Sequence, residues 1–272
     1  MDISNNSPEF GQLDAKDQGS ALKIQGLTPM LAQYFEIKYQ NPGSLLFFRM
    51  GDFYELFFDD AVEAARVLDI TLTRRGKYQG EDIPMCGVPF HAADSYLGRL
   101  IRRGYRVAIC EQVENPQEAK KRGNKSVVKR AVARVITPGT VTEESLLEAR
   151  SNNYLACVTV VQVTVAVAWV DVSTGELQSQ DLNPDQLGAV LARIAPSEIL
   201  VSDKLISNQE GPNSLTQQLN DWRLILTILP SSRFDSANGI KRLKKLYNVA
   251  ALDSFGSFSR SEFTACGALV DY

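Results

Sequence analysis

The second half of the chain changes its hydrophobic pattern in a set order, and this order restricts the fold more than any other feature of the sequence. Three runs rich in β-branched residues come first, at 154–163, 165–172 and 177–182. Closely spaced runs of this kind predict an antiparallel meander. Helical patterns follow at 185–194, 214–221, 239–247 and 261–272, with apolar strands between them at 198–201 and 224–229. Strands joined through helices pair in parallel, so the meander should continue as a mixed sheet.

The first half mixes strands and helices around one predicted sheet. A capping threonine and a proline predict a helix from Thr28 that ends before Asn41. Two aromatic-rich runs flank the pair Gly51-Asp52, which indicates a hairpin. The other expected elements are a helix opened by a capping box at 60–63 and ending near 69, a helix at 91–103, strands at 70–73, 107–110 and 132–136, and loops at 74–76, 84–89 and 115–128. The predicted fold class is α/β, a mixed-sheet domain followed by a ribonuclease-H-like domain.

Composition removes several classes of function. No run of about 18 uncharged apolar residues is present, which argues against a membrane span, and the acidic start lacks the apolar core of a signal peptide. The four cysteines are scattered and His91 is the only histidine, so the sequence contains neither a zinc motif nor a disulfide framework, and a reducing cytoplasm is expected. The stretch 123–126 is the nearest approach to a phosphate-binding loop, but Glu118 stands where a Walker glycine is needed.

Positive charge is concentrated in one stretch. Residues 99–134 hold eleven basic side chains and three glutamates, in a chain whose net charge is −3. A local positive field of this kind is typical of a protein that binds an anionic partner. A solvated basic loop explains the same pattern, so charge alone leaves both interpretations open.

The predicted hairpin carries the most informative pair of residues. Side chains two apart on a strand share a face, so Phe53 and Glu55 should point the same way beside the turn. In one interpretation Phe53 is a core residue and Glu55 a solvated edge residue. In the other, the ring of Phe53 wedges into a duplex, where stacking on a base is worth about 1–3 kcal/mol and opening costs least at mispaired bases. Glu55 is then repelled by phosphates unless it takes up a proton or a displaced base offers it an N–H donor.

Residues 50–57, Met-Gly-Asp-Phe-Tyr-Glu-Leu-Phe, resemble the Phe-x-Glu signature of the MutS family of DNA mismatch-repair proteins. Further similar stretches occur in the family's order at 28–30, 72–76, 83–91, 108–112 and 135–140. Together they cover nearly all of 28–150. Residues 151–272 resemble the connector domain of the family more diffusely, chiefly at 171–176.

The resemblance implies a domain organisation and a site. A polar, disordered tail (1–27) would precede a mismatch-recognition domain (28–140), a linker helix (141–152) and a ribonuclease-H-like connector domain (153–272), with the lever, clamp and ATPase domains absent from the chain. Phe53 would stack on a mispaired or looped-out base and Glu55 would hydrogen-bond it. The residues expected near the same surface are Arg74 and Arg75, beside the DNA backbone, together with Met50, Met85 and His91.

The resemblance also implies partners and cofactors. The expected ligand is duplex DNA that contains mismatches or small loops, and the connector domain is expected to contact a MutL-type partner. ATP and Mg²⁺ belong to C-terminal domains of the family, which also form its homodimer. This segment is therefore expected to be a monomer in the bacterial cytosol, associated with the nucleoid and not with a membrane. It should hold neither cofactor nor metal, and it should not be an enzyme.

Two other functions compete with this interpretation. A ribonuclease-H-like sheet can carry Mg²⁺-binding carboxylates, and Asp171 lies where one such ligand would stand. The other acids, Glu176, Glu198 and Asp221, do not complete a convincing set, and Asp171 and Glu176 flank a predicted turn. A protein-interaction module without DNA contact is the third possibility, and salt-dependent DNA binding would separate it from the first.

Overall fold

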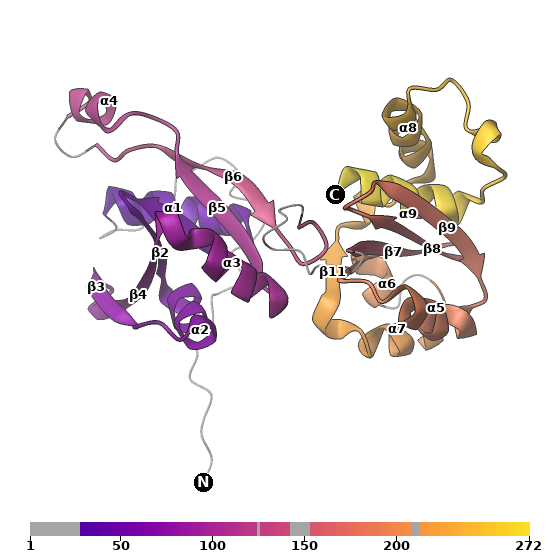
Figure 1. Cartoon of the computed structure of the whole chain (residues 1–272), viewed down its shortest axis with the longest axis horizontal. Coiled ribbons are helices and arrows are strands. Elements are labelled where there is room, and N and C mark those ends of the chain that lie inside the picture. The colour runs from indigo at the N-terminus through magenta and orange to yellow at the C-terminus, as the bar shows by residue number, and fades with distance from the viewer. Residues whose placement is uncertain (1–27, 124–125, 142–152, 208–210, 212) are drawn as a thin grey trace, which may run out of the picture.

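The computed structural model describes residues 28–123, 126–141, 153–207, 211 and 213–272, which form two α/β domains side by side (Figure 1). The tail predicted at 1–27 and residues 142–152 of the predicted linker helix lie outside the described residues. We call 28–141 the first domain and 153–272 the second domain. No helix in the described ranges is both long and apolar enough to cross a membrane.

In the described part of the first domain, six strands form one mixed sheet with the order β3-β4-β2-β1-β5-β6. Its strands are β1 (Ser44–Met50), β2 (Phe53–Phe57), β3 (Thr73–Tyr78), β4 (Glu81–Pro89), β5 (Arg106–Gln112) and β6 (Arg130–Ile136). Strand β1 pairs antiparallel with β2 and in parallel with β5. The β1–β2 turn and the end of β5 therefore lie at the same edge of the sheet.

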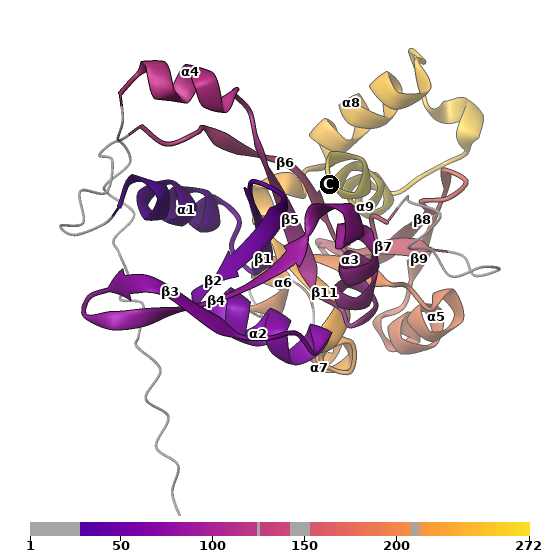
Figure 2. The same ribbon diagram turned by 60° about the vertical axis from the view of Figure 1, so that its left-hand side comes forward.

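Helices cover both faces of this sheet (Figure 2). The apolar residues of α1 (Pro29–Gln40) pack with Leu46, Phe48 and Phe57 on one face, which we call the α1 face. The helices α2 (Phe58–Leu68) and α3 (Ala93–Arg102) pack with Phe47, Tyr54 and other residues on the opposite face. Successive residues of β1 and β2 thus alternate between two cores.

Two predicted helix starts have different outcomes. Thr28 caps α1 as predicted, because its Oγ1 accepts the backbone N–H of Leu31 at 3.3 Å. The capping box predicted at 60–63 is wrong, since α2 begins at Phe58 and has no side-chain cap. Asp60 is instead a buried acceptor within the first turn, at 3.0 Å from the amide of Leu46 and 2.7 Å from Lys38 Nζ. Its carboxylate joins α1, α2 and β1, a use that local spacing does not reveal.

The region after α2 corrects three predictions. No strand forms at 70–72, and β3 contains Arg74-Arg75-Gly76, which was predicted as a loop. Residues 84–89, also predicted as a loop, belong to β4. Pro84 has no N–H to donate, and the β3–β4 pairing shifts its register next to it, between Arg74 and Lys77. An irregularity in the neighbouring strand thus lets a proline lie inside the sheet.

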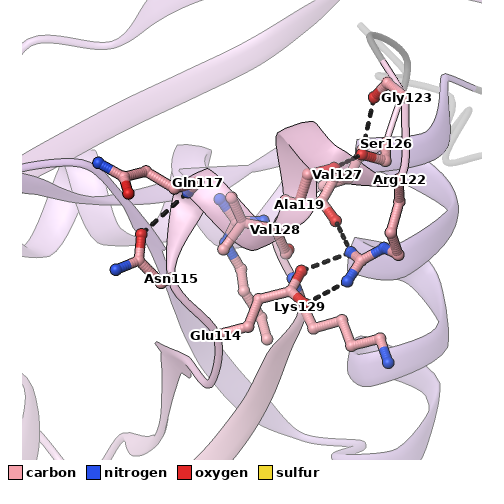
Figure 3. A network of polar contacts seen from close by, with 11 residues as sticks. Glu114, Asn115, Gln117, Ala119, Arg122, Gly123, Ser126, Val127, Val128 and Lys129 are labelled. Atoms are coloured by element: carbon pink, nitrogen blue, oxygen red, sulfur yellow. Dashed lines mark hydrogen bonds and ion pairs between the residues drawn. The ribbon is translucent and has the colours of Figure 1, made fainter.

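The predicted basic loop at 115–128 contains a short helix, α4 (Pro116–Lys121), which Asn115 caps by accepting Gln117 N–H at 2.9 Å. We call residues 113–129 the arm; residues 124–125 lie outside the described ranges. Glu114 organises the arm by accepting from the guanidinium of Arg122 and, at 2.6 Å, from the backbone N–H of Lys129 (Figure 3). This pair with Arg122 holds the pKa of Glu114 at about 2.

In the second domain, the described strands form a five-stranded sheet with the order β11-β10-β7-β8-β9. The strands are β7 (Tyr154–Val161), β8 (Thr164–Asp171), β9 (Glu176–Leu182), β10 (Glu198–Ser202) and β11 (Leu226–Leu229). β7, β8 and β9 are an antiparallel meander, while β10 pairs in parallel with both β7 and β11. This is the predicted ribonuclease-H-like arrangement.

Helices flank the second sheet on both sides. Those of the second domain are α5 (Leu187–Ile194), α6 (Asp203–Ile206), α7 (Asn213–Asn220), α8 (Ser236–Tyr247) and α9 (Arg260–Asp271). Helices α5 and α7 pack on one face and α8 and α9 on the other. Single-turn 3-10 helices lie at Phe90–Ala92 (η1), Pro184–Gln186 (η2), Arg223–Ile225 (η3), Ser231–Arg233 (η4) and Asp253–Phe255 (η5).

The two domains meet at the carboxylate of Glu198, which is 1% exposed at the start of β10. From the first domain, Thr137 Oγ1 and the backbone N–H of Gly139 donate to Oε2 at 2.5 and 3.1 Å. From the second domain, Thr227 Oγ1 and the hydroxyl of Tyr272 donate to Oε1 at 2.5 and 2.7 Å. We call this arrangement the joint. A buried carboxylate satisfied by four donors fixes how the chain leaves the first domain.

Candidate functional site

The β1–β2 turn positions Phe53 at the edge of the sheet. Met50 and Phe53 are paired across the turn, and Gly51 supplies the positive φ of +62° that it requires. Tyr54 and Leu56 point into the core behind the sheet, so Phe53 and Glu55 lie on the α1 face, as their spacing predicts. Phe53 is 47% exposed, which is unusual for a large apolar residue on a strand.

Glu55 lies in a gap on this face. Gly87 of β4 is its direct partner across the β2–β4 pairing and places no side chain beside it. A Cβ atom at Gly87 would lie 3.8 Å from both Glu55 Cγ and Phe53 Cδ1. Because Gly87 has no such atom, β4 places no side chain against either Phe53 or Glu55 at this position.

Arg75 is the partner of Glu55 in this structure. Its Nη1 lies 2.5 Å from Oε1 and 2.6 Å from Oε2 of the carboxylate. The Glu55 side chain is 12% exposed and that of Arg75 is 48% exposed. The pair therefore leaves one side of the guanidinium open to an anion from solvent.

The other predicted residues are distributed around this pair. Met50 ends β1, and Met85 lies on β4 between Phe57 and Thr73 in the ladder; both are partly buried among the residues of the α1 face. His91 is exposed in η1, immediately after β4. Arg74 is exposed and directed to Asp82, with Nη1 3.3 Å from Oδ2, and does not share the contact that Arg75 makes.

Two arginines near the hairpin were not singled out from the sequence. Arg130 donates from Nε to the carbonyl of Arg49 at 2.6 Å and from Nη1 to Gln33 Oε1 at 3.1 Å, and its guanidinium lies 4.8 Å from the ring centre of Phe48. Burial lowers its pKa. Arg49 stacks on Phe90, 3.5 Å from the ring centre. Arg130 stood in the basic run, but only the β5–β6 register shows that it lies beside the hairpin.

Behind the sheet, Tyr54 supports the hairpin from the opposite face. Its hydroxyl donates to Glu111 of β5, and burial raises its pKa, with Glu111 adding to the effect. The link ties the strand that carries Phe53 to β5 across β1. The exposed ring therefore stands on a braced strand rather than on a loose loop.

The arm leaves the sheet at the same edge as the hairpin. Val113 N–H donates to the carbonyl of Lys129 at 2.9 Å, which closes the base of the arm where β5 ends and β6 begins. Lys120, Lys121 and Lys129 are exposed on the arm. The basic run seen in the sequence is thus in part a folded projection next to the α1 face.

Asp171 has a structural role that favours no nuclease chemistry. Its Oδ1 accepts the backbone N–H of Ser173 at 2.9 Å, and its carbonyl accepts from Thr174 and Gly175. These bonds form the turn between β8 and β9, as predicted from the spacing. Within the described ranges, no three side chains of the His, Cys, Asp and Glu types gather into a group that could hold a metal ion.

Comparison with known proteins gives the same two units. The family model described as MutS domain I matches residues 28–145, and that of MutS domain II matches 153–272. The DNA mismatch repair protein MutS of Ruegeria pomeroyi is 55% identical over 246 residues, which are 90% of this chain and 28% of that protein. That of Paracoccus denitrificans is 56% identical over 245 residues, 90% of this chain and 27% of that protein. The chain spans little more than a quarter of the length of these relatives. It belongs to the MutS family, of which it carries domains I and II.

Proposed function

We propose that the chain recognises mispaired or unpaired bases in duplex DNA as part of DNA mismatch repair. One observation carries the proposal: half-exposed Phe53 and the carboxylate of Glu55 lie side by side on a braced strand, next to Gly87, which has no side chain. The relatives, which are named DNA mismatch repair protein MutS, support the same role.

Phe53 supplies the wedge. Stacking an aromatic ring on a base is worth about 1–3 kcal/mol and depends little on which base it is. The cost of opening the base stack depends strongly on the duplex and is least where bases are mispaired. The stacking free energy is thus nearly constant, while the free energy of opening the duplex varies from site to site. The ring therefore selects sites that are easily deformed rather than a particular sequence.

Glu55 supplies the selection against sound duplex. The minor groove of paired DNA offers few N–H donors, so a carboxylate placed there gains no hydrogen bond and is repelled by phosphates. A displaced base presents the donor that paired DNA lacks. The residue next to the wedge thus penalises every duplex except one with a base out of place.

Phe53→Ala tests the wedge. The loss of stacking should weaken binding to a duplex with one unpaired base by between about fivefold and a hundredfold, and leave binding to the matched duplex nearly unchanged. Fluorescence anisotropy with two labelled duplexes of otherwise identical sequence measures both constants. Phe255→Ala is a matched control, because Phe255 is 51% exposed in the second domain. Undiminished preference in the Phe53 variant would refute the wedge.

Glu55→Gln tests the selection. Removing the negative charge should strengthen binding to the matched duplex and change the affinity for the unpaired-base duplex less. The difference in affinity between the two duplexes should therefore become smaller. The same anisotropy titrations, run at two salt concentrations, separate this effect from a general change in phosphate attraction. If the dissociation constant for the matched duplex did not change, Glu55 would not be repelling matched DNA.

The remaining proposals concern the longer relatives. We propose that domain II contacts a MutL-type partner and that ATP and Mg²⁺ bind in parts of the family that this chain does not include. Dimerisation would also come from those parts, so the 272-residue chain should sediment as a monomer. A location in the bacterial cytosol, close to the nucleoid, follows from a role on chromosomal DNA.

A further inference from the structure

Arg75 reaches Glu55 across an intervening strand. β3 carries Arg75 and β2 carries Glu55, while β4 lies between them. Neighbouring strands are about 4.8 Å apart, so the two backbones are separated by roughly 10 Å. The irregularity of β3 between Arg74 and Lys77 and the missing side chain at Gly87 leave a path along the α1 face.

The contact neutralises a charge at the position that would meet DNA. Arg75 Nη1 bridges both carboxylate oxygens at 2.5 and 2.6 Å, and the Glu55 side chain is only 12% exposed. Without a counter-charge, this carboxylate would face the partly apolar surroundings of Phe53 and the sheet. In the DNA-free protein, Glu55 is thus already satisfied.

A DNA phosphate would compete for the same guanidinium. Arginine binds carboxylates and phosphates through the same donors, and the Arg75 side chain is 48% exposed. Arg130 is also close enough to Glu55 for its charge to matter, but its guanidinium is held by Arg49 and Gln33. Arg75 is therefore the group whose transfer to phosphate would leave Glu55 without a partner.

We propose that Arg75 is a specificity-determining residue, because DNA binding transfers its guanidinium from Glu55 to a backbone phosphate and thereby exposes the charge of Glu55 to the duplex. On matched DNA the phosphate takes over Arg75, but the released carboxylate of Glu55 finds no donor and stays charged and unpaired, which weakens binding. On DNA with a displaced base, the base N–H replaces Arg75. This inference rests on the proposed function and adds the source of the penalty.

A double-mutant cycle in the 272-residue chain tests the transfer. The parent, Glu55→Gln, Arg75→Ala and the double variant are titrated with the matched duplex by fluorescence anisotropy. Glu55→Gln should strengthen binding to the matched duplex in both backgrounds. The gain in affinity should be about three to ten times larger in the parent than in Arg75→Ala, because only the parent has an Arg75–Glu55 ion pair to break. Arg75→Ala should also lower the slope of log K against log salt by about one.

Arg74→Ala provides the matched control, since Arg74 has the same charge on the same strand and is directed to Asp82. In a double-mutant cycle with Glu55→Gln, the effects of the two substitutions on the free energy of binding the matched duplex should add. Arg75→Gln repeats the test with a neutral side chain that is longer than alanine. Thermal unfolding checks that each variant is folded.

The outcomes separate the two proposals. Suppose that Glu55→Gln strengthens binding to the matched duplex equally in the parent and in Arg75→Ala, while the parent prefers the unpaired-base duplex and Phe53→Ala loses that preference. This result would overturn the role of Arg75 and leave the proposed function intact. A parent chain that binds neither duplex, or both equally, would refute the proposed function and this inference with it.

Discussion

Gly139→Ala should release the first domain from the joint. A Cβ atom at Gly139 would lie 2.7 Å from Glu198 Cβ, 2.8 Å from Leu155 Cδ1 and 2.9 Å from Glu198 Oε2. Glu198 and Leu155 are paired on neighbouring strands inside the second sheet, so neither can retreat without disturbing it. The loop that carries residue 139 must move instead.

The magnitude follows from the bonds that this movement breaks. Thr137 Oγ1 and the Gly139 N–H both donate to Oε2 of Glu198. A hydrogen bond to a charged group contributes about 1.5–3 kcal/mol, so the loss of both should cost the docking of the domains roughly 3–6 kcal/mol. Thr227 and Tyr272 keep their bonds to Oε1, which limits the damage inside the second domain.

Two measurements check this outcome. Small-angle X-ray scattering should show a larger radius of gyration, and hydrogen exchange should show lost protection at the amide of residue 139. Both tryptophans, Trp169 and Trp222, lie in the second domain, so the tryptophan fluorescence transition should shift little. Gly188→Ala is the control, because a Cβ there lies 3.6 Å from Gln218 Oε1, an ordinary contact. Parent-like scattering and protection in the Gly139 variant would refute the joint as the fastening of the two domains.

Two further predictions concern the arm and the thiols. Glu114→Gln should loosen the arm, so that trypsin cleaves after the basic residues of α4 faster than in the parent or in the Glu118→Gln control; parent-like cleavage would contradict the role of Glu114. Because the pKa of Glu114 falls from 4.5 to about 2 in the folded arm, its contribution should persist above pH 4.5 and disappear as the pH falls towards 2. All four cysteines are buried, and burial raises the pKa of each thiol: Cys86 to about 11, Cys110 to about 12, Cys266 to about 11, and Cys157 well above its usual value. A thiol reagent at pH 8 should therefore label the native chain only as fast as the chain unfolds. Rapid labelling would show that one of the cores is open to solvent.

Elements defined by local chemistry could be predicted from the sequence. The Thr28 cap, the hairpin at Gly51-Asp52 and the antiparallel meander of the second sheet all depend on residues that are close in the chain. The shared face of Phe53 and Glu55 followed from strand geometry alone. These features need no knowledge of what the rest of the chain supplies.

Features defined by distant partners could not be predicted in this way. Asp60 had the spacing of a capping box, but the amide of Leu46, a strand away, uses its carboxylate. The sequence predicts a loop at 74–76, and a loop residue has no fixed neighbour. Only the pairing of β3 with β4, and of β4 with β2, brings Arg75 to Glu55, which is 20 residues away.

Strand β5 connects the hairpin that carries Phe53 with the joint at Glu198. Its Glu111 end receives the hydroxyl of Tyr54, directly behind the exposed ring of Phe53. At its other end the guanidinium of Arg106 lies 6.0 Å from the ring centre of Tyr272, which donates to Glu198 in the joint. Its seven residues span about 23 Å and pair with β1 on one side and β6 on the other, with a register shift in the β6 pairing between Ile109 and Cys110. The strand that braces the hairpin behind Phe53 is thus also the strand whose other end lies beside the joint.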